Sequence, residues 1–497
     1  MAGWVHEMDA VACLSPSDVR WLLEDSNGAH ALGARDLVSA CRWLEDERGD
    51  YEYEGEEAAG KRLGLALANG RRLLCATLRR RLETPDAATT SASAMMELEL
   101  THEQYAPSEV TALLWLQLDF GPGLKGADSG WYLVVGFEDG TLRFLDEGGK
   151  RVAKEFSAHG SAVRSIRANS AESGLRRDTR GVTSQGLCVC SEDAVVVLSL
   201  EDLLRVHHEV RNRGDGGRGK GRGRRRGSGG RRGDDDLARF DLSPAVAGAA
   251  DAVCLGCENL SLAQQLEGVP LSAAMLRVIV AGDDPALCCV RVRARPASQD
   301  GHGGGLLSAA LDWGTSAIPI VGRIKRKIAG RAAGAGASER DQVGQASAPI
   351  STGLPFLDPG RQCHTLVPCP TKPLVCCCDS LGRILVLDAS NFVITRVLKG
   401  YRDAEASWAV RRGRPLLAVL APRRERVEVW DVLEGRRTSK AACGRNDALA
   451  RAHWSLAGNA MARDGGGGAG EPVLVSVSHT GGIEIRRIFA TEADEPA

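Results

Sequence analysis

The sequence predicts an all-β protein built as a single WD-repeat-like β-propeller of about seven blades. Helical periodicity is nearly absent after residue 85, where short apolar runs alternate with Gly and Asp turns. A propeller repeats four-stranded blades at about 40–45 residues each, so seven blades need roughly 300 residues. The chain has 497 residues, which leaves room for long insertions. The repeats are degenerate, because only Trp430-Asp431 shows the expected Trp-Asp dipeptide. A β-sandwich is the alternative fold.

Two hairpins are the best-defined elements. Leu63 to Leu78 turns at Asn69-Gly70, and Trp131 to Phe144 turns at Asp139-Gly140. Glycine accepts a positive φ angle without a Cβ clash, as a tight hairpin requires. The other strands are expected at residues 110–118, 187–190, 194–198, 274–281, 288–292, 374–378, 384–387, 393–397, 416–420, 427–430, 473–477 and 483–485.

The N-terminal region is expected to differ from the rest. Ser15 to Asp18 has the residue types of a helix cap, and Leu37, Cys41 and Leu44 fit one helical face. An acidic stretch at residues 45–57 is interpreted as a solvated linker. The expected division is a helical and acidic segment at 1–58, the propeller at 59–490 and a tail at 491–497.

Two insertions interrupt the predicted propeller. Arg211 to Asp236 is dominated by Arg and Gly and is too polar to offset its chain entropy by burial, so a disordered loop is expected. An RNA-binding segment is the alternative, although no aromatic residue is interleaved for base stacking. The second insertion, residues 300–348, contains a possible basic amphipathic helix around Ile320 to Ile328. This helix would either pack on the propeller or touch a membrane surface.

Composition argues for an intracellular protein. The net charge is −1, which implies neither a nucleic-acid nor a membrane partner. The 15 cysteines cluster on apolar strands, where neighbouring residues point to opposite faces and cannot form a regular disulfide framework. The sequence opens with no signal peptide and contains no 18-residue apolar run. The expected location is the cytosol, with any membrane contact peripheral.

No enzyme signature is found. The sequence lacks a GxGxxG or GxxxxGK[ST] phosphate loop in a strand–helix context, and it lacks a Gly-x-Ser-x-Gly elbow. Cys254-Leu-Gly-Cys257 is a lone CxxC without the second ligand pair that a zinc site needs. We therefore expect no catalytic residue, no metal site and no cofactor.

Several segments carry a family resemblance. They are Val397-Leu-Lys-Gly-Tyr-Arg-Asp-Ala404, Leu420-Ala-Pro-Arg-Arg-Glu-Arg-Val-Glu-Val-Trp430, Cys378 to Asp388 and Trp131 to Phe144. Together they resemble the N-terminal domain of the non-catalytic (regulatory) subunit of the Rab-3 GTPase-activating protein. The resemblance is clear over roughly residues 130–145 and 375–445. That family's subunit continues into a long helical C-terminal region, whereas this sequence stops just after its last strand. Either the sequence is truncated or only the propeller is kept.

The resemblance implies a function. The subunit forms a heterodimer with a catalytic subunit that accelerates GTP hydrolysis on Rab-3-type GTPases and supplies the catalytic arginine. The same complex is implied in nucleotide exchange on Rab-18, with consequences for the endoplasmic reticulum, lipid droplets and autophagy. The expected role of this chain is a regulatory platform that is not itself an enzyme. A generic WD-repeat interaction scaffold is the alternative, followed by an RNA-binding protein acting through its Arg/Gly loop.

The partner surface is expected in the connections that follow two strands. The candidates are Lys399, Tyr401, Arg402, Asp403, Trp408, Arg423 and Arg424. Tyr, Trp and Arg are enriched at interface hot spots. The competing interpretation is that Tyr401 and Trp408 fill the space between blades while Arg402 and Asp403 form an internal ion pair.

Overall fold

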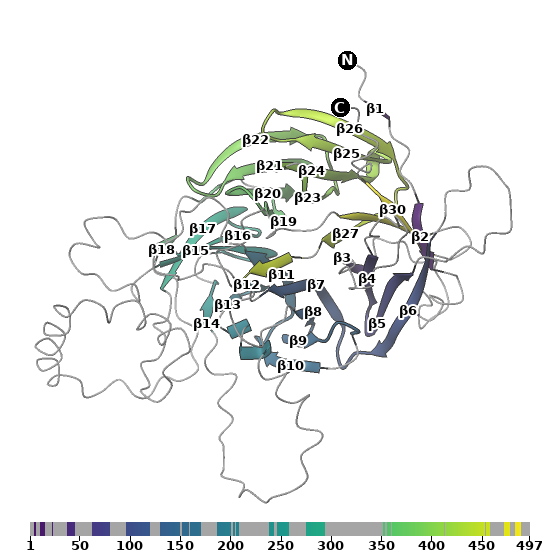
Figure 1. The fold of residues 1–497 in the computed structure, drawn as a ribbon. Helices are drawn as coiled ribbons and strands as arrows, with labels where there is room; N and C mark the ends of the chain where they lie inside the picture. The colour runs from purple at the N-terminus through teal and green to yellow at the C-terminus, as the bar shows by residue number, and fades with distance from the viewer. Residues whose placement is uncertain are drawn as a thin grey trace, which may run out of the picture.

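The structure is a computed structural model. It describes residues 4–5, 10–14, 22, 37–44, 62–79, 96–119, 130–149, 152–158, 160–169, 186–199, 202–203, 205–207, 238–242, 246–257, 275–293, 351–352, 355–358, 360–411, 413–452, 454–457, 472–477 and 483–488. Within these ranges the regular structure is almost entirely β-strand (Figure 1).

The strands form a seven-bladed propeller, which confirms the predicted fold class. Blade 1 holds β3 (Val38–Leu44), β4 (Arg62–Asn69), β5 (Arg72–Arg79) and β6 (Met96–Tyr105). Blade 2 holds β7 (Val110–Asp119), β8 (Gly130–Phe137), β9 (Thr141–Leu145) and β10 (Val152–Ser157). Blade 3 holds β11 (Val163–Asn169), β12 (Gly186–Ser191), β13 (Ala194–Ser199) and β14 (Ala238–Asp241). Blade 4 holds β15 (Asp251–Cys257), β16 (Met275–Ala281), β17 (Leu287–Arg293) and β18 (Ser351–Thr352).

The last three blades follow the same plan. Blade 5 holds β19 (Cys363–Pro368), β20 (Leu374–Asp379), β21 (Arg383–Asp388) and β22 (Val393–Lys399). Blade 6 holds β23 (Glu405–Arg411), β24 (Arg414–Ala421), the 3₁₀ turn η4 (Pro422–Arg424), β25 (Arg426–Asp431) and β26 (Arg436–Ala442). Blade 7 holds β27 (Ala448–Ala452), β29 (Val473–Val477), β30 (Ile483–Arg487) and β2 (Ala10–Leu14). Two short strands pair in parallel with blade edges: β1 (Trp4–Val5) with β26, and β28 (Trp454–Ala457) with β7.

A strand from the N-terminal region closes the ring. The outer strand of blade 7 is β2, which pairs antiparallel with β30 and in parallel with β6 of blade 1. The inner strands of the same two blades also pair, because β27 runs parallel to β3. Figure 1 shows purple β2 beside yellow β30. The first and last parts of the described chain are therefore held together by backbone hydrogen bonds.

The expected helix at residues 37–44 is wrong, because this segment is strand β3, antiparallel to β4. Consecutive residues Ser39 to Arg42 are all buried. A strand buried on both faces shows no alternation of apolar and polar residues, so chance spacing can imitate a helix. The propeller also includes Ala10–Leu14 and Val38–Leu44 and does not begin at residue 59.

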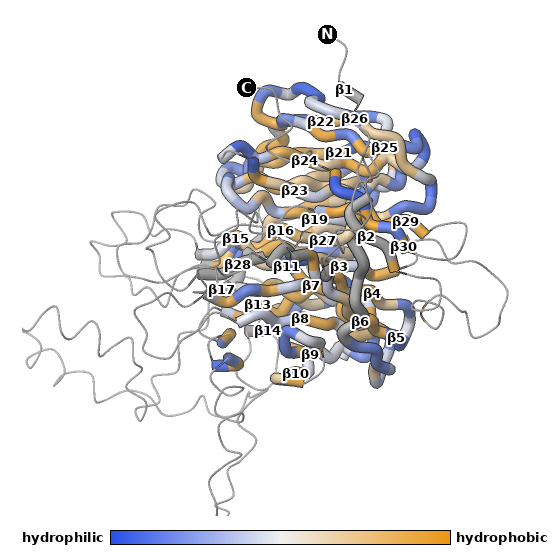
Figure 2. The backbone as a smooth tube through the Cα atoms, turned by 45° about the vertical axis from the view of Figure 1, so that its right-hand side comes forward, coloured by the Kyte–Doolittle hydropathy of each residue, from blue (hydrophilic) through white to orange (hydrophobic). Residues whose placement is uncertain are grey.

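The core lies between neighbouring blades, where the faces of adjacent sheets pack together. Many blade strands are largely apolar, as the orange stretches of the tube in Figure 2 show, whereas the outer strand β26 is mostly polar. In β12 all six residues are buried. Both predicted hairpins are present, and Gly70 and Gly140 adopt positive φ angles of 53° and 78°.

Several expectations fall outside the described residues. They are the cap at Ser15 to Asp18, the acidic stretch at 45–57, the Arg/Gly insertion at 211–236, the insertion at 300–348 and the tail at 491–497. Among the residues that the structure describes, no helix is both long and apolar enough to cross a membrane.

Candidate partner-binding surface

Three segments that carry the family resemblance meet at one end of blades 5 and 6. They are the β20–β21 turn, the β22–β23 connection and the β24–β25 turn. The backbone carbonyl of Gly382 in the first segment accepts hydrogen bonds from the N–H groups of Gly400 and Tyr401 in the second, at 2.9 and 2.8 Å. Arg424 in the third donates to the carbonyl of Lys399 at 3.5 Å. Segments up to 42 positions apart thus form one surface.

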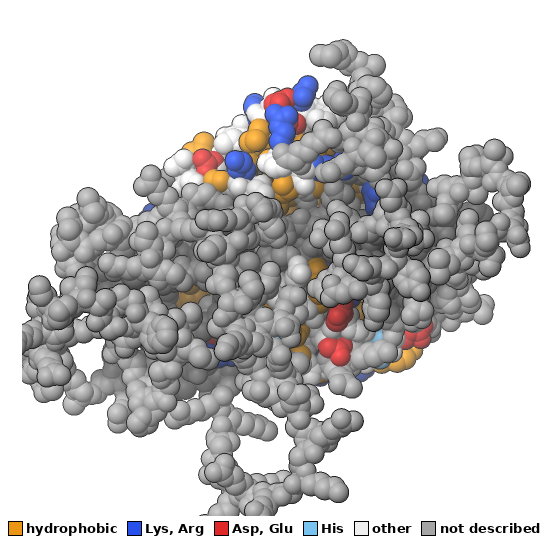
Figure 3. Space-filling view, viewed as in Figure 1, with side chains coloured by type: hydrophobic (Ala, Val, Ile, Leu, Met, Phe, Trp, Pro, Cys, Tyr) orange, Lys and Arg blue, Asp and Glu red, His pale blue; other side chains and the backbone are white. Residues whose placement is uncertain are grey.

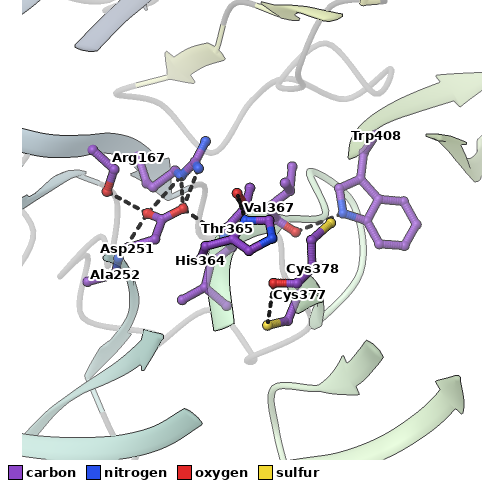
Figure 4. A network of polar contacts seen from close by, with 11 residues as sticks. Arg167, Asp251, Ala252, His364, Thr365, Val367, Cys377, Cys378 and Trp408 are labelled. Carbon is purple, nitrogen blue, oxygen red and sulfur yellow. Dashed lines mark hydrogen bonds and ion pairs between the residues drawn. The ribbon is translucent and has the colours of Figure 1, made fainter. Parts of the chain in front are cut away.

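Tyr401 and Trp408 lie inside the junction between blades 5 and 6, below this surface. Tyr401 is 4% exposed, and its hydroxyl donates to Glu428 Oε2 at 2.5 Å. Trp408 is 1% exposed, and its indole N–H donates to the carbonyl of Val367 in blade 5 at 2.8 Å (Figure 4). These two aromatic residues join blade 5 to blade 6, so the packing interpretation holds for them. They do not offer side chains to a partner.

Glu428 is the polar centre below the surface. It is fully buried, and it accepts hydrogen bonds or ion pairs from Tyr401, Trp430, Arg426 and Arg437. A buried carboxylate without partners would be costly, and these donors offset that cost. This end of blades 5 and 6 is therefore held by buried polar contacts as well as by apolar packing.

The other five candidates are exposed: Lys399, Arg402, Asp403, Arg423 and Arg424. Arg423 Nε lies 2.6 Å from Asp403 Oδ2, and both side chains remain about half exposed. Exposed ion pairs of this kind contribute about 0–1 kcal/mol to stability. These five side chains are therefore accessible at the surface.

Two glycines position two of the arginines. At Gly382 (φ +87°) a Cβ atom would lie 2.7 Å from Arg402 Cγ and 2.8 Å from the Arg402 backbone nitrogen. At Gly400 (φ +86°) it would lie 2.3 Å from an Arg424 guanidinium nitrogen. Arg424 also lies over the Tyr401 ring, with Cζ 4.6 Å from the ring centroid. Both glycines have positive φ angles and no Cβ atom, which leaves room for the two arginine side chains beside them.

Leu381 is a surface residue that the sequence reasoning missed. It is 47% exposed in the turn Asp379-Ser380-Leu381-Gly382 and precedes the glycine on which Arg402 lies. A leucine in a hairpin turn, where polar residues are usual, was the available signal. Asp379 anchors this turn by accepting hydrogen bonds from the backbone N–H and Nε of Arg383 at 2.7 and 2.5 Å. Burial alone would raise the pKa of Asp379, but these bonds and the Arg383 charge lower it.

The comparisons with known proteins decide the family. A family model described as "Rab3 GTPase-activating protein regulatory subunit N-terminus" matches residues 58–449. The chain belongs to this family. A "Rab3 GTPase-activating protein regulatory subunit" from Caenorhabditis elegans is 38% identical over 68 residues. That match covers 13% of this chain and 5% of the relative, so it spans only a small part of the relative's length.

Solved structures similar to this family member include WD40 propeller domains at low sequence identity. The WD40 propeller domain of Doa1 is 9% identical with a TM-score of 0.43, and the match covers 98% of this chain and 99% of that one. The C-terminal WD40 domain of Sif2 is 10% identical with a TM-score of 0.39, covering 98% and 100%. Saccharomyces cerevisiae Sqt1 is 9% identical with a TM-score of 0.38, covering 86% and 82%.

No group of three or more His, Cys, Asp or Glu side chains suited to a metal ion occurs among the described residues. The cysteines whose side chains the structure describes are buried thiols. Burial raises the pKa of Cys41 and Cys75 to about 12, which disfavours the nucleophilic thiolate.

Alkaline pH is expected to weaken the junction. Burial raises the pKa of Tyr401 to about 12, with a further contribution from its hydrogen bond to Glu428, and burial alone raises that of Tyr132 to about 12. The unfolded chain loses these protons near pH 10, so the stability that depends on the neutral phenols is present below pH 10 and is lost as pH rises from about 10 to 12. Ultraviolet difference absorbance should show two tyrosines that ionise late. Tyr401→Phe should remove one of them, and a folded protein whose tyrosines all ionise near pH 10 would contradict this expectation.

Proposed function

We propose that this chain acts as the non-catalytic regulatory subunit of a Rab3-type GTPase-activating complex. It provides a propeller platform that binds a catalytic subunit and regulates GTP hydrolysis on Rab GTPases. The family match over residues 58–449 carries this proposal. The convergence of three resemblance segments on one exposed surface supports the placement of the partner contact there.

The catalytic arginine is assigned to the partner. An arginine finger that stabilises charge on the transferred phosphate is worth about 10³–10⁵ in rate, and it must enter the GTPase site. Arg423 is ion-paired with Asp403, and Arg424 lies on the Tyr401 ring. Arginine side chains that lie against the surface of their own domain are better suited to recognising a partner than to inserting into a GTPase active site. The wider roles of the complex are part of the same proposal: nucleotide exchange on Rab-18, action at endoplasmic-reticulum membranes and in autophagy, and a cytoplasmic chain with peripheral membrane contact.

Reconstitution tests the proposal. This chain is expected to co-purify with the catalytic subunit of the Rab3 GTPase-activating complex. Single-turnover GTP hydrolysis on Rab3 should be accelerated by the pair and left unchanged by this chain alone. Release of labelled nucleotide from Rab-18, measured with the same pair, tests the exchange activity.

The control is an unrelated WD40 propeller of similar size in place of this chain. Failure to co-purify, or a hydrolysis rate that the control raises equally, would remove the proposal. The generic interaction scaffold would then be the function that remains.

A further inference from the structure

The partner-binding surface carries an excess of positive charge. Its exposed ionisable side chains are Lys399, Arg402, Asp403, Arg423, Arg424, Glu425 and Arg445. Two of the five cations neutralise the two carboxylates: Arg423 pairs with Asp403 and Arg445 with Glu425, at 2.6 and 2.7 Å. Lys399, Arg402 and Arg424 form no ion pair with any residue that the structure describes. Three cations on one end of two adjacent blades therefore lack a described counter-charge.

Two of these three cations lie against neighbouring residues of their own surface. The stem of Arg402 rests on Gly382, and the guanidinium of Arg424 fits between Gly400 and the Tyr401 ring. A side chain that is ordered before binding loses less entropy when a ligand arrives. The planar guanidinium also matches a carboxylate through two parallel hydrogen bonds. Such an arrangement favours a ligand with carboxylates in fixed positions.

An apolar contact lies beside the cations. Leu381 is half-exposed and adjoins Gly382, the residue that supports Arg402. Figure 3 shows cationic, acidic and apolar side chains together at the top of the view, where the outer strands of blades 5 and 6 lie. We propose that this surface binds an acidic segment of a protein partner. Carboxylates of that segment contact Arg402 and Arg424, and one of its apolar side chains packs on Leu381. That the segment belongs to the catalytic subunit rests on the proposed function.

An anionic membrane fits the surface less well than an acidic peptide. A membrane-binding face combines several apolar side chains with cations, and acidic groups are repelled by anionic lipids. Here Asp403 and Glu425 lie among the arginines, and Leu381 is the apolar contact that adjoins Arg402. A peptide can place single carboxylates on the arginines and avoid Asp403 and Glu425. A membrane presents a continuous negative surface, which both acidic side chains repel.

The first experiment measures affinity for the catalytic subunit and for a labelled peptide of alternating Glu and Leu, over a series of salt concentrations. Arg402→Ala/Arg424→Ala is expected to weaken both interactions about tenfold or more and to flatten their salt dependence, because exposed charge contacts are screened by salt. Leu381→Ser should weaken both without changing the salt dependence.

The matched control is Arg436→Ala. Arg436 is an equally exposed arginine on β26, ion-paired with Glu434 after the β25–β26 turn at the other end of blade 6. It should leave both affinities unchanged. Thermal melting of every variant verifies folding, since the altered residues are exposed.

The outcomes distinguish the inference about an acidic segment from the proposed function. If the double variant binds both probes as the wild type does, the inference is overturned even where co-purification supports the proposed function. If the catalytic subunit does not bind but the peptide binds through Arg402 and Arg424, the acidic specificity stands and the proposed partner fails. Binding to phosphatidylserine vesicles without binding to the peptide would assign the surface to a membrane and overturn the inference.

Discussion

Replacing Asp251 with alanine is expected to destabilise the propeller by about 3–5 kcal/mol, the usual cost of removing one partner of a buried ion pair. Asp251 is fully buried at the start of β15 in blade 4. Its carboxylate accepts hydrogen bonds from the hydroxyl of Ser165 and from two nitrogens of Arg167, both in blade 3. It also accepts the backbone N–H groups of Ala252 and of Leu366 in blade 5, at 2.9 and 2.7 Å (Figure 4). One side chain therefore connects the inner strands of three blades.

The cost arises because the donors stay buried when the acceptor is removed. Arg167 would be left without its counter-charge, and the N–H of Leu366 would lose its partner. Asp251→Leu combined with Arg167→Met should therefore be less destabilised than the sum of the two single changes, since no buried charge remains. Asp283→Ala, an exposed aspartate in the same blade, is the control and should stay within about 0.5 kcal/mol of wild type. Chemical denaturation checks the series, and an Asp251→Ala protein as stable as the control would show that the network does not bear on stability.

Local sequence signals account for the strands that were predicted correctly. The hairpins at Asn69-Gly70 and Asp139-Gly140 depend on the turn residues and on apolar runs within a few residues of the turn. They can therefore be identified from the sequence without knowledge of tertiary contacts. Strand β3 was missed because both of its faces are covered by other blades. Closure of the ring by β2 was also missed, since it depends on pairing with β30, 469 to 476 positions away. Pairing between such distant segments leaves no local pattern.

Only part of the candidate site was predicted, because contacts between distant segments again leave no local pattern. Exposure of Lys399, Arg402 and Arg424 follows from their charge and from their place in connections between strands. The burial of Tyr401 and Trp408 depends on Glu428 and Val367, which belong to other parts of the chain. Residue type alone cannot distinguish an interface aromatic from one that packs between blades. The sequence likewise showed no sign of the Asp251 network, because its partners in the other blades lie 84 to 115 positions away.

Tyr401→Ala and Arg402→Ala change adjacent residues, but only Tyr401→Ala is expected to lower the melting temperature. Tyr401→Ala removes a buried ring at the junction of blades 5 and 6, deprives Glu428 of a donor and leaves Arg424 without its stacking partner. Large-to-small changes of buried aromatic residues cost about 3–5 kcal/mol, so a clear fall in melting temperature is expected. Arg402→Ala truncates an exposed side chain and should leave the melting temperature within about one degree of wild type.

The two changes therefore separate folding from recognition. Changing both residues at once would confound the two effects, because weaker partner binding would follow from unfolding alone. Arg402→Ala in a folded protein tests the surface, and Tyr401→Phe, which keeps the ring and removes the hydrogen bond, should cost only about 1–2 kcal/mol. Melting and co-purification measured on the same samples decide the matter. If Tyr401→Ala melted like the wild type while losing the partner, Tyr401 would be a contact residue after all, and the packing explanation would be wrong.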